Sequence, residues 1–259
     1  EAEEPTTLEF EAAGPRRHLY FDPLRTKAAV VTCGGLCPGL NDVIRAIVME
    51  AYHHYHMAGV LGIPFGLEGF IPKYGHRYIE LTPDKVRDIH LFGGTVLGSS
   101  RGPQDPGEIV DTLERSNVNM LFIIGGDGTM KAGRAIFEEV TRRNLKIAII
   151  GIPKTIDNDL PLPKGTPTFG YESAKDKGAV IARAVYVDAR TSGNWFVLAA
   201  MGRSAGHLAF GIGEACHYPM IVIPEMFDKT EITVEKIVNL VISSIIKRKI
   251  MGMDYGAAV

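Results

Sequence analysis

The chain has 259 residues, 46% hydrophobic and 22% charged, with 29 glycines, three cysteines and a formal net charge of −2. The near-neutral charge argues against nucleic acid or an anionic membrane surface as partner, and no apolar run approaches the roughly 18 residues that a membrane helix needs. Sparse cysteines favour a reducing compartment over a disulfide framework, so we expect a cytoplasmic protein with no nucleic-acid or membrane partner.

Short apolar runs that end in glycine-rich or polar loops dominate the first part of the chain. The runs expected to form strands or edge elements are residues 27–33, 60–64, 95–98, 118–124 and 146–152. Apolar residues recur at helical spacing over residues 42–52, after the glycines that follow the first run. This order of strand, loop and helix predicts a mainly parallel sheet that binds ligands beyond the carboxyl ends of its strands.

The composition shifts beyond Pro163. Helices are expected at residues 171–188, 206–216 and 235–249, and strands at residues 195–200 and 220–224. We predict an α/β protein with an N-terminal extension over residues 1–26 and two Rossmann-like lobes over residues 27–165 and 166–259, with the active site in the cleft between them. The last residues read as a helix-to-strand junction, so the second lobe is expected to be incomplete.

The segment Gly125-Gly-Asp-Gly-Thr129 is a glycine turn between an expected strand and an expected helix. Without side chains, phosphate oxygens can approach backbone N–H groups at the positive end of the helix dipole. Asp127 in this turn suits a hard cation such as Mg²⁺, which prefers carboxylates together with substrate phosphates. The alternative is a tight turn built for packing.

Two carboxylates, Asp157 and Asp159, lie two residues apart directly after the strand at residues 146–152. An extended backbone there would point both side chains the same way. Phosphoryl transfer needs positioning, charge neutralisation and a carboxylate that accepts the proton of the attacking hydroxyl. An Asp-rich surface turn is the competing interpretation.

Two arginines and one glutamate also follow expected strands or lie in small-residue loops. Arg101 lies among small residues and Arg203 opens a helix, so each can meet an anionic group. Glu225 follows the strand at residues 220–224, where a carboxylate can accept hydrogen bonds from sugar hydroxyls or can instead begin a helix.

Taken together, six segments in order resemble the phosphofructokinase family from about residue 28 to residue 225. They are Gly34-Gly-Leu-Cys-Pro-Gly-Leu-Asn41, Leu97-Gly-Ser-Ser-Arg101, Gly125-Gly-Asp-Gly-Thr129, Pro153-Lys-Thr-Ile-Asp-Asn-Asp159, Met201-Gly-Arg203 and Pro224-Glu225. The resemblance implies glycolytic transfer of a phosphoryl group from Mg²⁺-bound ATP to the 1-hydroxyl of fructose 6-phosphate. It also implies a donor-binding lobe, a sugar-phosphate-binding lobe and a homo-oligomer, dimer or tetramer.

The resemblance assigns roles to individual residues. It makes Asp157 the base with Asp159 beside it, and it makes Asp127 the Mg²⁺-associated carboxylate. The catalytic set it implies is Thr155, Asp157, Asp159, Arg101 and Arg203. The implied ATP pocket is Gly35, Arg101, Gly126, Asp127, Gly128 and Thr129, and the implied fructose 6-phosphate site is Lys154, Thr155, Asp157, Met201, Gly202, Arg203 and Glu225.

Two positions bear on the phosphoryl donor, and they disagree. Gly128 leaves room for the α-phosphate of a nucleotide, where pyrophosphate-dependent members carry an Asp-bearing version. Lys154 is instead the residue of the pyrophosphate type. The pair is similar to a group of ATP-using enzymes from plants, trypanosomatids and some bacteria, so ATP is favoured and pyrophosphate is the alternative.

Two other readings compete with this one. NAD and lipid kinases share the glycine turn but do not resemble the segments around Asp157 and Met201. A non-catalytic regulatory or structural subunit would keep the fold, and it gains weight if the natural chain ends at Val259. The retained Asp127, Asp157 and Arg101 oppose it.

Overall fold

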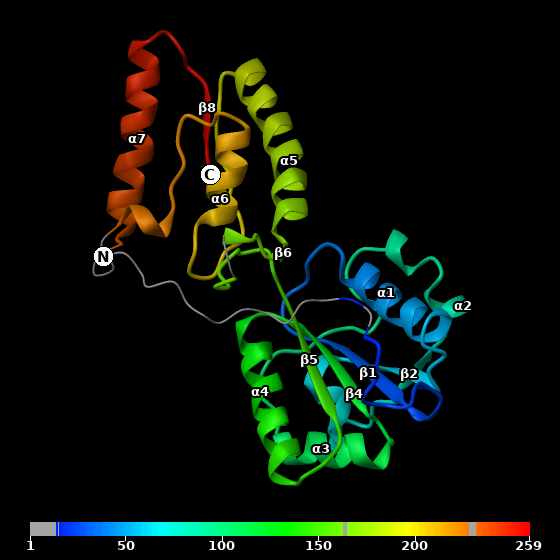
Figure 1. Cartoon of the computed structure of the whole chain (residues 1–259). Helices are drawn as coiled ribbons and strands as arrows, with labels where there is room; N and C mark the ends of the chain where they lie inside the picture. Colours follow the sequence, from blue (N-terminus) through cyan, green and yellow to red (C-terminus); the bar gives the residue numbers. More distant parts are fainter. Residues whose placement is uncertain (1–13, 15, 163–164, 228–231) are drawn as a thin grey trace.

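The computed structural model describes residue 14 and residues 16–162, 165–227 and 232–259. Two α/β units lie one above the other, and the chain passes between them through the long strand β5 and the short strand β6 (Figure 1). Helices flank mainly parallel strands, so the predicted α/β class is confirmed. Most of the predicted N-terminal extension, residues 1–13 and 15, lies outside the described residues.

The first unit is built on a six-stranded sheet in the order β3-β2-β1-β4-β5-β6. Its strands are β1 (Lys27–Thr32), β2 (Gly59–Ile63), β3 (Ile79–Leu81), β4 (Met120–Gly125), β5 (Ala148–Thr155) and β6 (Phe169–Gly170). Neighbouring strands are parallel except β3, which is antiparallel to β2 at the edge. The sheet therefore has the crossover connections that the alternating strands and helices predict.

Helices cover both faces of this sheet (Figure 1). They are α1 (Leu40–His53), α2 (Pro83–Val86), α3 (Pro106–Arg115) and α4 (Asp127–Arg142). Ala29 and Val31 of β1 pack in one core cluster with residues of α3 and α4, whereas Ala28 and Val30 pack with residues of α1 and α2. Because β1 is buried on both faces, it reads as a continuous apolar run.

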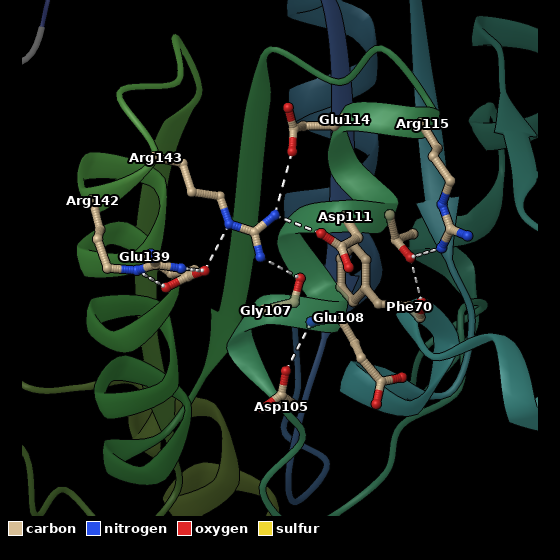
Figure 2. Close-up of polar contacts among 11 residues, drawn as sticks. Phe70, Asp105, Gly107, Glu108, Asp111, Glu114, Arg115, Glu139, Arg142 and Arg143 are labelled. Carbon is tan, nitrogen blue, oxygen red and sulfur yellow. Dashed lines mark hydrogen bonds and ion pairs between the residues drawn. The ribbon is translucent and has the colours of Figure 1, made fainter.

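Polar contacts add to the packing of α3 against α4, and they converge on Arg143 (Figure 2). Its guanidinium donates to Glu139 Oε1 at 2.7 Å, to Gly107 O at 3.2 Å and to Glu114 Oε2 at 3.4 Å, and it also contacts Asp111. One planar group with several N–H donors thus joins the end of α4 to α3.

The second unit contains α5 (Tyr171–Ser192), β7 (Trp195–Val197), α6 (His207–Ala215), α7 (Val234–Ile250) and β8 (Gly256–Ala258). Strands β7 and β8 are parallel, and α5 lies against α6. A Cβ placed on Gly178 of α5 would lie 2.4 Å from Ile212 Cδ1, so a larger residue at this position would force the Ile212 side chain to shift. Helix α7 stands apart in Figure 1, and none of its 17 residues is buried.

Three details differ from the sequence-based expectations. Residues 95–98 form a turn, and the Thr95 hydroxyl lies 2.9 Å from the buried Thr32 hydroxyl. Within residues 220–224 only Met220 forms a β-bridge, with Ala258. The edge strand β3 and helix α3 were not expected, although Asp105 accepts a hydrogen bond from the Glu108 N–H at 2.9 Å and caps α3 recognisably.

Candidate active site

The predicted site loops meet at the carboxyl edge of the first sheet. In the parallel register Gly125 pairs with Pro153, and Thr155 pairs with Gly170. A Cβ placed on Gly126 would lie 3.6 Å from the Lys154 carbonyl oxygen. The loop after β4 and the loop after β5 are therefore neighbours, as the strand order predicts.

The glycine turn forms the head of α4, where Gly126 is the N-cap and makes no side-chain capping bond. The first N–H groups of a helix have no intrahelical partner, so this helix start can receive an anion. No heavy atom lies within 4 Å of a Cβ placed on Gly128, whereas one placed on Gly125 would lie 2.2 Å from Thr129 Oγ1. Gly125 is thus required for packing, and Gly128 faces open space.

Asp127, the first residue of α4, is 58% exposed and forms an ion pair with Lys131 at 2.8 Å. Among the described residues no group of three or more His, Cys, Asp or Glu side chains could hold a metal ion. Mg²⁺ commonly binds through one or two carboxylates plus substrate phosphates and water. A single exposed carboxylate beside an anion-receptive turn fits that mode of binding.

The loop after β5 carries the two predicted carboxylates on a bent backbone. The Asp157 N–H donates to Thr155 Oγ1 at 3.0 Å, and Asn158 adopts a left-handed conformation with φ 54°. Asn158 Oδ1 accepts a hydrogen bond from the Thr168 N–H at 2.9 Å. The backbone is not extended here, so the expectation of an extended segment is wrong. Asp157 is half-buried and Asp159 is exposed.

Gly35, Arg101 and Lys154 come together from three separate segments. The Lys154 ammonium donates to the Gly35 carbonyl, and Arg101 Nη2 lies 3.8 Å from a Cβ placed on Gly35. Lys154 is only 4% exposed, and this burial lowers the pKa of its side chain, although the neighbouring Cys37, Cys33 and Asp157 act in the opposite direction.

The remaining predicted residues gather at the head of α6 in the second unit. Met201 is 69% exposed, and Gly202 and Arg203 are exposed beside it. Glu225 Oε1 accepts a hydrogen bond from the Gly206 N–H at 2.8 Å, which lowers the pKa of that carboxyl. Glu225 therefore supports the start of α6 in addition to any role towards a ligand.

Sequence reasoning missed the residues that hold the Arg101 loop in place. The buried Asn41 donates to Phe92 O at 2.9 Å and accepts from the Val96 N–H at 2.8 Å. The buried Thr32 hydroxyl donates to Gly98 O at 2.8 Å. The sequence did carry a signal for these two residues. Thr32 is a polar residue at the end of a buried strand, and Asn41 is one on the buried side of a helix; buried polar groups of this kind are almost always hydrogen-bonded.

The fold and the loops define the class of the chain, an α/β protein whose glycine turn and polar loops lie together at the carboxyl edge of a parallel sheet. Residues 27–251 match the family model described as Phosphofructokinase. The chain belongs to the phosphofructokinase family. Of the helices that the structure describes, none is both long and apolar enough to cross a membrane.

Curated relatives agree with this assignment. The chain is 49% identical over 200 residues to an ATP-dependent 6-phosphofructokinase of Borreliella burgdorferi, covering 77% of this chain and 44% of that protein. It is 49% identical over 201 residues to the enzyme of the same name from Trypanosoma cruzi, covering 77% of this chain and 41% of that protein. The chain thus spans under half the length of these two relatives.

The fold likeness extends to more distant proteins. A pyrophosphate-dependent phosphofructokinase from Marinobacter aquaeolei superposes with a TM-score of 0.77 over 90% of this chain and 59% of that chain, at 21% identity. At that identity the likeness shows the fold alone.

Proposed function

We propose that the protein transfers a phosphoryl group from Mg²⁺-bound ATP to the 1-hydroxyl of D-fructose 6-phosphate, giving fructose 1,6-bisphosphate. The observation that carries this proposal is the proximity of two loops. The uncapped head of α4, open at Gly128, lies beside the end of β5, which leads to Asp157. Relatives that are 49% identical and named ATP-dependent 6-phosphofructokinase support the same reaction.

Asp157 is the base in this proposal. Its half-buried carboxylate follows β5, where it would accept the proton of the attacking sugar hydroxyl, and Thr155 would contact the sugar phosphate and the transferring group. The exposed Asp159 would add negative charge beside the base. The bond that forms joins the sugar oxygen to the γ-phosphorus, and the bond that breaks leaves ADP.

The donor would lie along the head of α4 in the lobe formed by residues 27–165. Gly35, Gly126 and Gly128 leave room there, and Thr129 stands behind the turn with 8% exposure. Asp127 would hold Mg²⁺, whose charge offsets that of the phosphates when it is bound. Arg101 would neutralise the charge that develops on the transferring phosphoryl group.

The sugar phosphate would be held mainly by residues of the second unit, in the lobe assigned to residues 166–259. Met201 and Gly202 would line the sugar, Arg203 would meet an anionic group, and the Glu225 carboxylate would accept a hydrogen bond from a sugar hydroxyl. Lys154 would contribute positive charge from the first unit.

ATP is favoured over pyrophosphate as donor because of the space at Gly128. No heavy atom lies within 4 Å of a Cβ placed there, so a nucleotide's α-phosphate would meet neither bulk nor negative charge. Lys154, the residue that points towards pyrophosphate, donates to the Gly35 carbonyl and is buried. Its ammonium is thus already engaged within the protein.

We further propose that the protein acts in the cytoplasm as a homo-oligomer, a dimer or tetramer. The three cysteines, Cys33, Cys37 and Cys216, are free and buried, which suits a reducing compartment.

A coupled assay of fructose 6-phosphate turnover tests the proposal. Full-length protein would be supplied with Mg²⁺ and either ATP or pyrophosphate, with the Asp157→Asn variant as the inactive control. Turnover with ATP alone supports the reaction and the donor, and turnover with pyrophosphate alone overturns the donor. Turnover with neither, from folded protein, overturns the reaction in favour of a non-catalytic subunit.

A further inference from the structure

The two residues that follow Pro64 after β2 both have left-handed backbone conformations. Phe65 has φ 55° and Gly66 has φ 62°. Left-handed geometry costs glycine little, but it is a genuine outlier for a bulky aromatic residue. Such outliers persist where surrounding contacts hold them, so the contacts of this turn are informative.

The Phe65–Gly66 turn interlocks with the segment that leads to Arg101. A Cβ placed on Gly66 would lie 2.7 Å from Ser100 Oγ and 2.8 Å from the Ser100 backbone nitrogen. Reciprocally, a Cβ placed on Gly98 would lie 2.9 Å from Cδ1 of the Phe65 ring. The Phe65 N–H also donates to the Leu97 carbonyl at 2.8 Å.

The same segment is held on its other side by the loop after β1. The Gly34 N–H donates to the Ser100 carbonyl at 3.1 Å, and the Ser99 hydroxyl donates to the Gly34 carbonyl at 2.6 Å. Arg101 Nη2 then lies 3.8 Å from a Cβ placed on Gly35. Residues 97–100 are thus clamped between two glycine turns, and Arg101 follows directly.

Neighbouring aromatic rings contact Phe65 on the outer side of this clamped segment. The Phe65 ring lies 4.8 Å, between centroids, from the His76 ring, which in turn lies 6.2 Å from that of Tyr74. Phe65 remains 48% exposed, so its ring is not a core residue. Its unfavourable backbone conformation therefore serves the local contact with Gly98 and not burial in the core.

We propose that the Phe65–Gly66 turn is a positioning element that fixes the guanidinium of Arg101 at the phosphoryl-transfer site. The inference rests on the proposed function and extends it to residues outside the resembling segments. Phosphoryl transfer depends on placing charge against the transferring group, and a misplacement of about 1 Å can lower the rate about 100-fold. A shift of Ser100 would be transmitted directly to the next residue.

The first test is Gly66→Ala in the full-length protein, with Gly252→Ala as the matched control. Gly252, just after α7, also has a left-handed φ, 79°, but no heavy atom lies within 4 Å of a placed Cβ, so it shares the backbone strain without the collision. We expect Gly66→Ala to lower kcat about 100-fold with little change in the KM for fructose 6-phosphate. The control should keep wild-type kcat while losing only the thermal stability that backbone strain alone costs.

A double-mutant cycle shows whether Gly66 acts through Arg101. If it does, adding Gly66→Ala to Arg101→Met should lower kcat no further, because the positioned group is already gone. Full additivity would overturn the inference and assign Gly66 to general packing.

Gly98→Ala disturbs the contact between Gly98 and the Phe65 ring, and it is the alternative test if Gly66→Ala does not fold. It should lower kcat by forcing the Phe65 ring away, and Phe65→Gly in the same chain should restore much of the loss by removing that ring. Absence of any recovery would contradict the proposed contact.

These variants separate this inference from the proposed function. If Arg101→Met keeps full turnover, the role of Arg101 fails and the inference with it. If Arg101→Met is impaired but both glycine variants match the Gly252→Ala control, only the positioning role fails.

Discussion

The ammonium of Lys154 donates a hydrogen bond to the backbone carbonyl of Gly35, a residue 119 positions earlier in the chain. The contact joins the end of β5 to the loop after β1, so two loops of the candidate site are held together from inside the protein. The contact also costs desolvation free energy, because Lys154, which carries the charge, is only 4% exposed.

Replacing this buried charge should stabilise the fold. Burial lowers the folded-state pKa of Lys154, so between that pKa and the ordinary value of 10.5 the unfolded chain binds more protons and stability rises with pH. We expect Lys154→Met to be more stable than wild type at pH 7 and to lack this alkaline rise. Thermal unfolding at pH 7 and pH 10 measures both effects. Lower stability of Lys154→Met at pH 7 would mean that the bond to the exposed Gly35 outweighs desolvation.

The base assignment predicts a large catalytic loss without loss of fold. Asp157→Asn keeps the size of a half-buried side chain but removes its capacity to accept a proton. We expect kcat to fall by about 10²- to 10⁴-fold, the usual contribution of general base catalysis, while the melting temperature stays near that of wild type. Steady-state kinetics and a thermal melt test this. Wild-type turnover would remove Asp157 from the reaction.

Gly128→Asp should change the preference between the phosphoryl donors without changing the fold. A Cβ at this position meets open space, and an acidic residue in the first turn of α4 interacts favourably with the helix dipole. The added charge would repel the α-phosphate of ATP, so we expect kcat/KM for ATP to fall relative to pyrophosphate. Competition assays with both donors give the ratio, and Gly252→Asp is a control at another glycine where a placed Cβ meets open space. An unchanged ratio would show that donor choice is set elsewhere.

Glu225→Ala should destabilise the second unit in a pH-dependent way. The Gly206 N–H holds the pKa of this carboxyl below its ordinary value of 4.5, so the stabilising effect is present above pH 4.5 and is lost as pH falls through the folded-state pKa. At pH 7 we expect a loss of about 1 kcal/mol, the usual net value of one hydrogen bond. Denaturant unfolding of this variant measures the difference, with Glu214→Ala, a substitution within α6, as the control. Equal stabilities would remove the helix-start role.

The contacts of Glu139 near the end of α4 should also stabilise the fold in a way that depends on pH (Figure 2). Hydrogen bonds from Arg142 and Arg143 lower its pKa from 4.5 to about 2. Its contribution to stability should be complete above pH 4.5 and disappear as pH falls to about 2. Melting temperatures of wild type and Glu139→Gln should therefore differ at pH 6 and converge in strong acid. A difference that does not change with pH would assign the effect to packing.

Much of the fold could be predicted because burial leaves a pattern in the sequence. A strand covered on both faces, such as β1, must be apolar throughout, and helices such as α1 must repeat apolar residues at helical spacing. Glycine turns after β1 and β4 then marked the edge where ligands are expected. The short edge strand β3 and the turn at residues 95–98 were harder, because hydrogen bonds to distant residues decide their conformation.

The candidate site was predictable as a set of loops but not as a set of contacts. Its segments could be recognised individually, yet nothing local reveals that Lys154 reaches Gly35 or that Gly66 faces Ser100. Likewise, the sequence left two interpretations of Glu225 open, and only the structure reveals its bond to the Gly206 N–H. The clearest failure, the extended geometry assumed around Asn158, came from a local rule that one left-handed residue overturns.

The exposure of α7 has a consequence for how the 259-residue chain unfolds. A helix whose residues are at most partly buried gains less from tertiary packing than the core strands do, so α7 should open at a lower free energy while β1 and β4 open only with the whole sheet. Amide hydrogens of α7 should therefore exchange with deuterium well before those of β1. Circular dichroism should begin to lose helical signal at temperatures where the fluorescence of Trp195, the single tryptophan, is still that of the native state. Unfolding of this chain would then be a sequence of transitions in place of one cooperative event.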